Sequence, residues 1–158
     1  IEEASKQAEA MANGEIKAAS PAQLQALLPA SLGSYQRTAT QSVAMGEMGS
    51  TAEGTYTAGD RTITLKVVDM AGVGALAGLG AALGVEANKE TADGYERTGT
   101  VDGRMRTEKW NRSDSSGSYG TVIAGRFMVE AEGQAGSIDE LKAAVAAVDQ
   151  SALEALTK

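Results

Sequence analysis

The chain has 158 residues, a net charge of −7 and a sequence pI near 4.6, and it contains no Cys and no His. Its length is enough for one domain with a substantial core. The missing residue types exclude Cys/His zinc sites and Ser-His-Asp or Cys-His catalytic groups. The acidic balance argues against nucleic acid, which is bound through Lys and Arg, and against docking on anionic lipid.

Residues 1–19 are polar and Ala-rich, and they predict a helix that ends near Asn13-Gly14, where a left-handed turn is favoured. The apolar side of this helix consists of Ile1, Ala4, Ala8 and Met11. We interpret residues 1–19 as a helical spacer and residues 20–158 as a single domain. Because the chain begins with Ile, we expect that a signal peptide, a lipoprotein leader or a tag preceded it.

A second helix is expected directly after the spacer. Ser20 is a suitable N-cap, Pro21 suits the first helical position, and Gln23 completes a capping box. The helix is expected to end near Leu28, because Pro29 follows it.

Alternating apolar and polar residues predict antiparallel strands on both sides of the middle of the chain. The clearest strand alternates Ile63, Leu65 and Val67 with polar residues. The dipeptide Asp102-Gly103 between two alternating runs is a strong hairpin signal. The strands are expected at residues 35–45, 52–58, 62–67, 95–101, 104–112, 121–124 and 126–131.

The C-terminal part predicts helices. Ser137 and Glu140 have the spacing of a capping box, and apolar residues recur at helical spacing from Ile138 to Val148. A last helical turn or two is expected over residues 151–156. These elements predict an α+β fold, in which a single antiparallel β-sheet packs with N- and C-terminal helices and a short Gly/Ala-rich central helix or loop.

The central stretch from Met70 to Val85 consists almost wholly of Gly, Ala, Leu and Val. As a helix its apolar part would reach ~22 Å, and it falls short of the ~20 residues that a membrane span needs. Gly72, Gly74 and Ala77 have the spacing of a dinucleotide fingerprint, but antiparallel hairpins follow where that motif requires a βαβ unit. The segment is therefore either held by the sheet or offered to a partner. Its candidate binding residues are Leu76, Leu79 and Leu83.

A second candidate site lies on the strand expected over residues 104–112. Alternation along this strand places on one face Arg104, Arg106, Glu108, Trp110 and Arg112. Trp and Arg are enriched at interface hot spots, so the tryptophan and the arginines of this face are candidate binding residues. The alternative is a solvated sheet face whose charges form cross-strand ion pairs, for example with Glu96.

Other patterns point only weakly to chemistry. Carboxylates are plentiful, but no spacing selects the close pair that acid–base catalysis needs, and most of them lie in turns. The segment 114–117 lacks the acidic series of a calcium loop, and one Met45-x-x-Met48 pair is slight evidence for copper(I). Asn111-Arg112-Ser113 fits a glycosylation sequon. No cofactor and no metal are expected.

Four stretches carry a family resemblance, and they are LQALLPASLGSYQRT (24–38), STAEGTYTAGDRTITLKVVDMAGVGA (50–75), GYERTGTVDGRMRTEKW (94–110) and GRFMVEAEGQAGSIDELKAAVAAVD (125–149). With them the chain resembles a poorly characterised group of bacterial envelope proteins and lipoproteins of unknown function. The layout is also similar to PsbP/DcrB-like domains. The resemblance implies a periplasmic or envelope location and a non-enzymatic binding or assembly role without catalytic residues. The chain departs from the group in having no lipobox cysteine.

The sequence thus leads us to expect an exported, non-enzymatic module that binds a protein partner through segment 70–85 or through the 104–112 strand face. One alternative is a carrier of a small apolar ligand, with the Gly/Ala-rich segment as a lid over the sheet. Another is a hydrolase that uses carboxylates. No nucleic-acid partner is expected, and contact with a membrane is expected only through a removed leader or anchor.

Overall fold

The computed structural model describes residues 19–44, 49–69, 87–101, 104–123 and 127–155. They form one nine-stranded sheet, in which every neighbouring pair of strands is antiparallel. In chain order the strands are β1 (Ser31–Leu32), β2 (Tyr35–Ala44), β3 (Ser50–Ala58), β4 (Arg61–Asp69), β5 (Ala87–Glu90), β6 (Gly94–Val101), β7 (Arg104–Asn111), β8 (Ser116–Ile123) and β9 (Phe127–Gln134).

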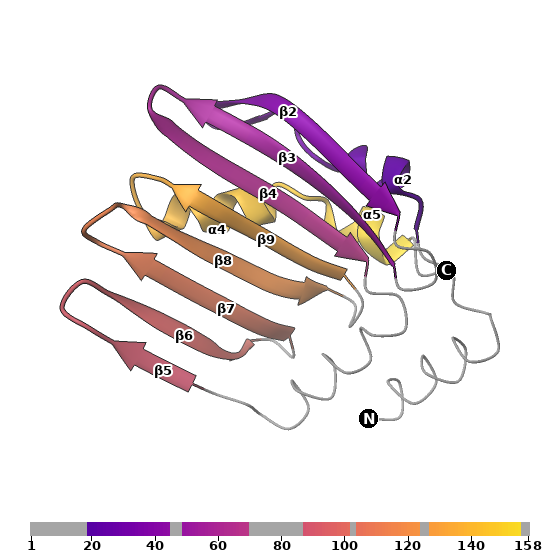
Figure 1. Ribbon diagram of the computed structural model, residues 1–158. Coiled ribbons are helices and arrows are strands. Elements are labelled where there is room, and N and C mark those ends of the chain that lie inside the picture. The colour runs from indigo at the N-terminus through magenta and orange to yellow at the C-terminus, as the bar shows by residue number, and fades with distance from the viewer. Residues whose placement is uncertain (1–18, 45–48, 70–86, 102–103, 124–126, 156–158) are drawn as a thin grey trace.

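The spatial order of the strands is β1-β2-β3-β4-β9-β8-β7-β6-β5. Strands β1 to β4 form one meander, and β5 to β9 form a second meander that runs back toward the first (Figure 1). The two meanders join where β4 pairs with β9. The chain therefore leaves the centre of the sheet after Asp69 and enters it again at the outer edge at Ala87.

Three short helices lie on one face of this sheet: α2 (Pro21–Gln25), α4 (Ile138–Ala146) and α5 (Gln150–Ala155) (Figure 1). Helix α2 packs on β2 and β3, α4 packs on β8, β9 and β4, and α5 contacts β8. The capping box predicted at the start of α2 is confirmed, because Ser20 accepts from the Gln23 backbone and Gln23 caps the Ser20 backbone in return.

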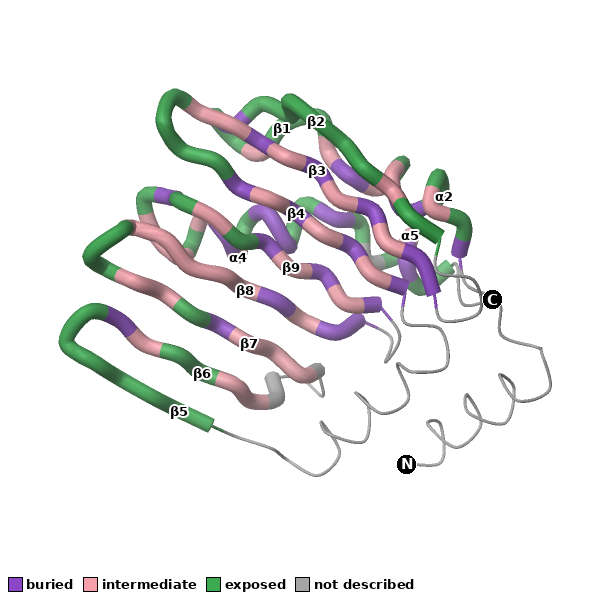
Figure 2. The backbone as a smooth tube through the Cα atoms, in the orientation of Figure 1, coloured by how far each residue is buried: buried purple, intermediate pink, exposed green. Residues whose placement is uncertain are grey.

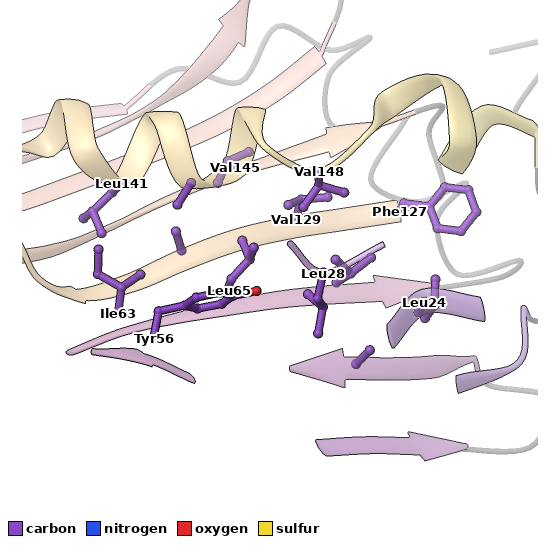
Figure 3. Close-up of a cluster of buried hydrophobic side chains, with 14 of the residues drawn as sticks. Leu24, Leu28, Tyr56, Ile63, Leu65, Phe127, Val129, Leu141, Val145 and Val148 are labelled. Carbon is purple, nitrogen blue, oxygen red and sulfur yellow. The ribbon is translucent and has the colours of Figure 1, made fainter. Parts of the chain in front are cut away.

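The hydrophobic core lies between the helices and β3, β4, β9 and β8. Alternate residues of β4 and β9 point into it, as the strand patterns predict, and their side chains meet Leu141, Val145 and Val148 of the C-terminal segment (Figure 3). The ring of Tyr56 lies against Gly54, where a Cβ atom would come within 2.9 Å of the ring. Glycine there makes room for the largest fully buried side chain of the core.

The opposite face of the sheet has no described helix over it. Its central residues are polar and half-buried, including Thr51, Thr55 and Thr64 (Figure 2). An ion pair joins Lys66 to Glu53 across β4 and β3 at 3.9 Å. This face is therefore polar in its middle, in contrast to the apolar helix side.

The predicted α+β fold class is wrong, because helices form only a small part of the described structure. The helices that the structure describes have only 5, 9 and 6 residues, whereas the sheet contains nine strands. The fold is thus largely a sheet, with helices over part of one face. The sequence suggested longer helices, because Leu28 and Val148 continue the apolar spacing, but Leu28 and Val148 lie in turns past the ends of α2 and α4.

Two further expectations differ from the structure or fall outside it. Ser137 makes no side-chain cap at the start of α4, so the second predicted capping box is wrong. Glu140 bonds instead to the Gly136 N–H at 2.5 Å and to the Tyr35 hydroxyl at 3.2 Å. The predicted helix of residues 1–12 and the central stretch 70–85 lie outside the described residues.

Candidate binding surface

The helices cover only part of their face of the sheet. Helix α4 packs mainly on β8 and β9 and reaches β7 through Lys142, and no described helix packs extensively on β5, β6 or β7 (Figure 1). The uncovered part carries, on the helix side, Tyr95, Arg97, Arg106, Glu108 and Trp110. We call these five residues the Trp110 surface.

Trp110 and Tyr95 are direct partners on β7 and β6. Trp110 is half-buried and packs against the edge of the hydrophobic core, and Tyr95 is also half-buried. Aromatic pairs in this cross-strand position stabilise a sheet. The backbones of Gly94 and Gly117 approach Trp110 closely from both sides, where a Cβ atom would lie 3.0 Å from its carbonyl carbon and its Cα respectively.

Glu108 is the buried charge of this surface, with a residue exposure of 6%. Its Oε1 lies 2.8 Å from Nζ of Lys142, which reaches from α4 past the ring of Tyr119 at 5.9 Å. Burial acts to raise the pKa of Glu108, but hydrogen bonds from Lys142 and Tyr95 and the nearby charges of Lys142 and Arg106 outweigh burial and lower it. Glu108 is therefore a carboxylate that ties α4 to the middle of β7.

Tyr95 is the second residue of this surface whose pKa is shifted. Burial raises its pKa, and the hydrogen bond to Glu108 and the negative charge of that carboxylate raise it further, to about 12. The guanidinium carbon of Arg97 lies 4.5 Å from the centroid of the Tyr95 ring, a cation–π distance. The phenol is thus held protonated and is fixed in place from two sides.

The arginines predicted as binding residues lie in different surroundings. Arg106 is half-buried on the Trp110 surface beside Glu108. Arg104 begins β7 opposite Val101, and its side chain is not among those described. Arg112 lies one residue past the end of β7, is exposed, and pairs with Glu90 of β5 at 3.6 Å. Of the predicted binding residues of this strand, the structure places Arg106 and Trp110 on the same face, with Glu108 between them.

The ion pair suggested with Glu96 is made neither by Arg106 nor by Arg112, the two arginines of this strand whose side chains are described. Glu96 pairs with Lys109 at 3.4 Å, and both side chains belong to the other face of the sheet. The sequence missed Tyr95, Arg97 and Lys142 as members of the same cluster. The hairpin signal at Asp102-Gly103 could have placed Tyr95 and Arg97 beside β7, whereas Lys142 comes from a helix far along the chain. Leu76, Leu79 and Leu83 lie outside the described residues.

Two hollows adjoin the sheet edge. One of about 400 Å³ is lined by Asn88, Lys89, Glu90, Tyr95 and Arg97, and one of about 260 Å³ follows the Thr91–Gly94 turn. A third hollow, of about 210 Å³, lies between the β1–β2 turn and α4 and contains Leu32, Ile63 and Ala144. The second and the third are smaller than the roughly 300–1,000 Å³ of ordinary small-molecule sites.

The chemistry available on the Trp110 surface is recognition. Its arginines can pair with carboxylates, and Trp110 and Tyr95 offer apolar area with a polar tip. Within the described ranges, no three acidic, His or Cys side chains come together in a way that could hold a metal ion. Among the helices that the structure describes, none has the length and apolar character needed to cross a bilayer.

Comparison with known proteins finds one distant structural similarity and no related sequence. No protein-family model matches the chain, and no curated protein matches it. A crystal structure of a GTP binding regulator from Thermotoga maritima is similar with a TM-score of 0.33 and 11% sequence identity, and the match covers 84% of this chain and 89% of that chain. A likeness of that size carries no argument about either fold or function.

Proposed function

We propose that the protein is a non-enzymatic binding module and that it engages a protein partner through the Trp110 surface. The observation that carries the proposal is the position of Trp110 and Tyr95, which remain partly exposed on strands where no described helix packs extensively. Trp, Tyr and Arg dominate binding energy at protein interfaces, and all three residue types meet here. Export to the cell envelope, which the family resemblance implies, is part of the proposal.

The charges of this surface suggest the chemistry of the partner. Within the Trp110 surface, Arg97 and Arg106 outnumber the single carboxylate of Glu108, although the whole chain has a net charge of −7. A local cationic area on an acidic protein favours a partner of opposite charge. We therefore expect a polypeptide segment that presents an apolar side chain flanked by Asp or Glu.

The geometry supports a rigid recognition surface. Glu108 and Lys142 fix β7 to α4, and Arg97 stacks on Tyr95. Side chains that are held before binding lose less conformational entropy when a partner docks. Such a surface can bind without a change in the fold of the sheet.

A displayed library of random peptides is the probe that tests the proposal. We expect selection on the full chain to enrich sequences with Asp or Glu next to Leu, Phe or Trp. Trp110→Ala should weaken the enriched peptides by about 30-fold or more, the loss typical of a hot spot of at least about 2 kcal/mol. Arg106→Glu should weaken them as well, because it reverses a charge at the contact.

The matched control is Lys66→Glu, which reverses a charge on the opposite face of the sheet. It should leave peptide affinity unchanged, and thermal melts should show that each variant is folded. Peptides that bind Trp110→Ala and Arg106→Glu as well as the original chain would refute the proposal. Failure to enrich any acidic-apolar sequence would refute it too.

A further inference from the structure

Strand β2 has a long edge without a partner strand among the described residues. Its neighbour β1 has only two residues, which pair with Tyr35 and Gln36, and one further bond joins the Arg37 N–H to the Ala30 carbonyl at 3.1 Å. From Thr38 to Ala44, β2 pairs with β3 on its inner side and with no described strand on its outer side. Every second residue of this edge directs its main-chain N–H and C=O groups outward.

This edge lacks most of the features that normally prevent pairing between sheets. Natural edges are blunted by charged side chains, Pro, short length or bulges. The stretch Thr38–Ala44 contains no charged residue and no Pro, and its one irregularity, between Arg37 and Ala39, affects only the beginning of the strand. Except for Ser42, the residues of this stretch are exposed (Figure 2).

The opposite edge of the sheet provides an internal comparison. Strand β5 has only four residues, two of which are Lys89 and Glu90. Charge and short length therefore protect that edge, whereas the β2 edge has neither. The β2 edge also carries Val43, a large apolar side chain that is 46% exposed. Unprotected main chain and an exposed apolar side chain thus coincide on β2.

We propose that the Thr38–Ala44 edge pairs antiparallel with the same edge of a second copy of this chain, so that the two sheets become continuous. An antiparallel pair of identical edges has two-fold symmetry, in which residues near the axis face their own counterparts. A charge there would meet a like charge, and this edge has none. A different protein that is selected by its charge would need charged groups on this edge, and residues 38–44 contain none.

The register with the greatest overlap places Gln41 of one copy opposite Gln41 of the other, and Val43 opposite Ala39. The Gln41 amides then lie next to each other across the axis, and the side chain of Val43 gains an apolar neighbour. The Trp110 surface lies on β6 and β7 at the far end of the sheet, so pairing leaves it open on both copies. The dimer would present that surface twice, whatever the surface binds.

The experiment measures the oligomeric state of the full chain by sedimentation equilibrium and light scattering over a range of concentrations. We expect a monomer–dimer equilibrium that Gln41→Lys and Gln41→Glu each weaken by about tenfold or more, because like charges then meet across the axis. Mixing the two variants in equal amounts should restore dimers, since opposite charges then face each other. A merely unfolded variant could not be rescued in this way.

Ala92→Lys is the matched control, because it adds the same charge at an exposed turn beside the other edge. It should dimerise like the original chain. A chain that stays monomeric at its highest soluble concentration overturns the proposal, even if the β2 edge captures an extended peptide from another protein. Dimers that persist in both Gln41 variants, or a mixture that does not recover, overturn it equally.

Discussion

The ammonium group of Lys142 lies 2.8 Å from Oε1 of Glu108 and joins helix α4 to strand β7 at the border of the covered part of the sheet. Glu108 is almost fully buried, while the Lys142 side chain keeps 37% of its exposure. A buried carboxylate is costly unless it is paired and hydrogen-bonded, and Glu108 is both. This contact lies where the helix layer ends over the sheet.

Glu108→Gln should lower the free energy of unfolding at pH 7 by about 1–3 kcal/mol, because hydrogen bonds to a charged group are lost. The pKa of Glu108 is lowered in the folded state, so its contribution is present above the unfolded value near 4.5 and is lost as the pH falls through the folded value. The difference between the two proteins should therefore shrink below pH ~4.5. Urea denaturation at pH 7 and in acid measures it.

The control for this experiment is Glu132→Gln, which removes a charge at an exposed position of β9. It should change stability by less than about 0.5 kcal/mol. Lys142→Met alone and together with Glu108→Gln completes a double-mutant cycle. A coupling energy of zero between the two positions would contradict the role given to this ion pair.

Tyr95 should be among the last tyrosines to ionise. Its pKa is raised to about 12, so the stability that it contributes is complete below the unfolded value near 10 and is lost as the pH rises toward 12. NMR of the protein labelled at its tyrosine ring carbons measures this ionisation directly. The Tyr95→Phe variant identifies the signal of Tyr95. Glu108→Gln should lower the pKa of Tyr95, since it removes a negative charge. An unchanged Tyr95 pKa in that variant would contradict the proposed contact.

The chain enters the described domain at Ala19, which two side chains hold. The Ala19 N–H donates to Oδ2 of Asp69 at 2.6 Å, and the Ser50 hydroxyl donates to the Ala19 carbonyl at 2.5 Å. Both side chains are buried at the ends of β4 and β3.

We expect Ser50→Ala to cost about 1 kcal/mol of stability and to speed hydrogen exchange at Ala19. Ser31→Ala, at an exposed position of β1, is the control and should change neither. Exchange at Ala19 that is unaffected by Ser50→Ala would argue against this anchor.

The sequence predicted the strands with regular alternation better than the others. Strand β4 appeared clearly because one side of it is core and the other is polar. Strand β5 was missed, because all four of its residues are exposed and the sequence Ala-Asn-Lys-Glu has no alternating pattern. Strand β8 was predicted too short, because the sequence indicated it only from residue 121, whereas it begins at Ser116 between β7 and β9.

The candidate surface shows the same limit. Alternation along one strand correctly grouped Arg106 with Glu108 and Trp110, because residues two apart share a face. It could not indicate that this face is the helix side, since that depends on the pairing of β7 with β8 and on the face of the sheet on which α4 packs. Lys142, which helps to lower the pKa of Glu108, comes from a helix that the strand pattern does not connect with β7. Contacts between distant elements, rather than local patterns, define the surface.

Gly117 should be required for the close packing of β8 against β7. A Cβ atom at this position would lie 2.1 Å from the Lys109 carbonyl oxygen, which is main chain and cannot rotate away. We expect Gly117→Ala to destabilise the protein by about 1–3 kcal/mol, the usual cost of overpacking, and to shift the fluorescence of the neighbouring Trp110. Gly120→Ala on the same strand is the matched control, because its nearest neighbour is the Thr107 hydroxyl at 3.3 Å, which can move. If both variants unfold at the same urea concentration, the close approach of the two backbones is not what selects glycine at residue 117.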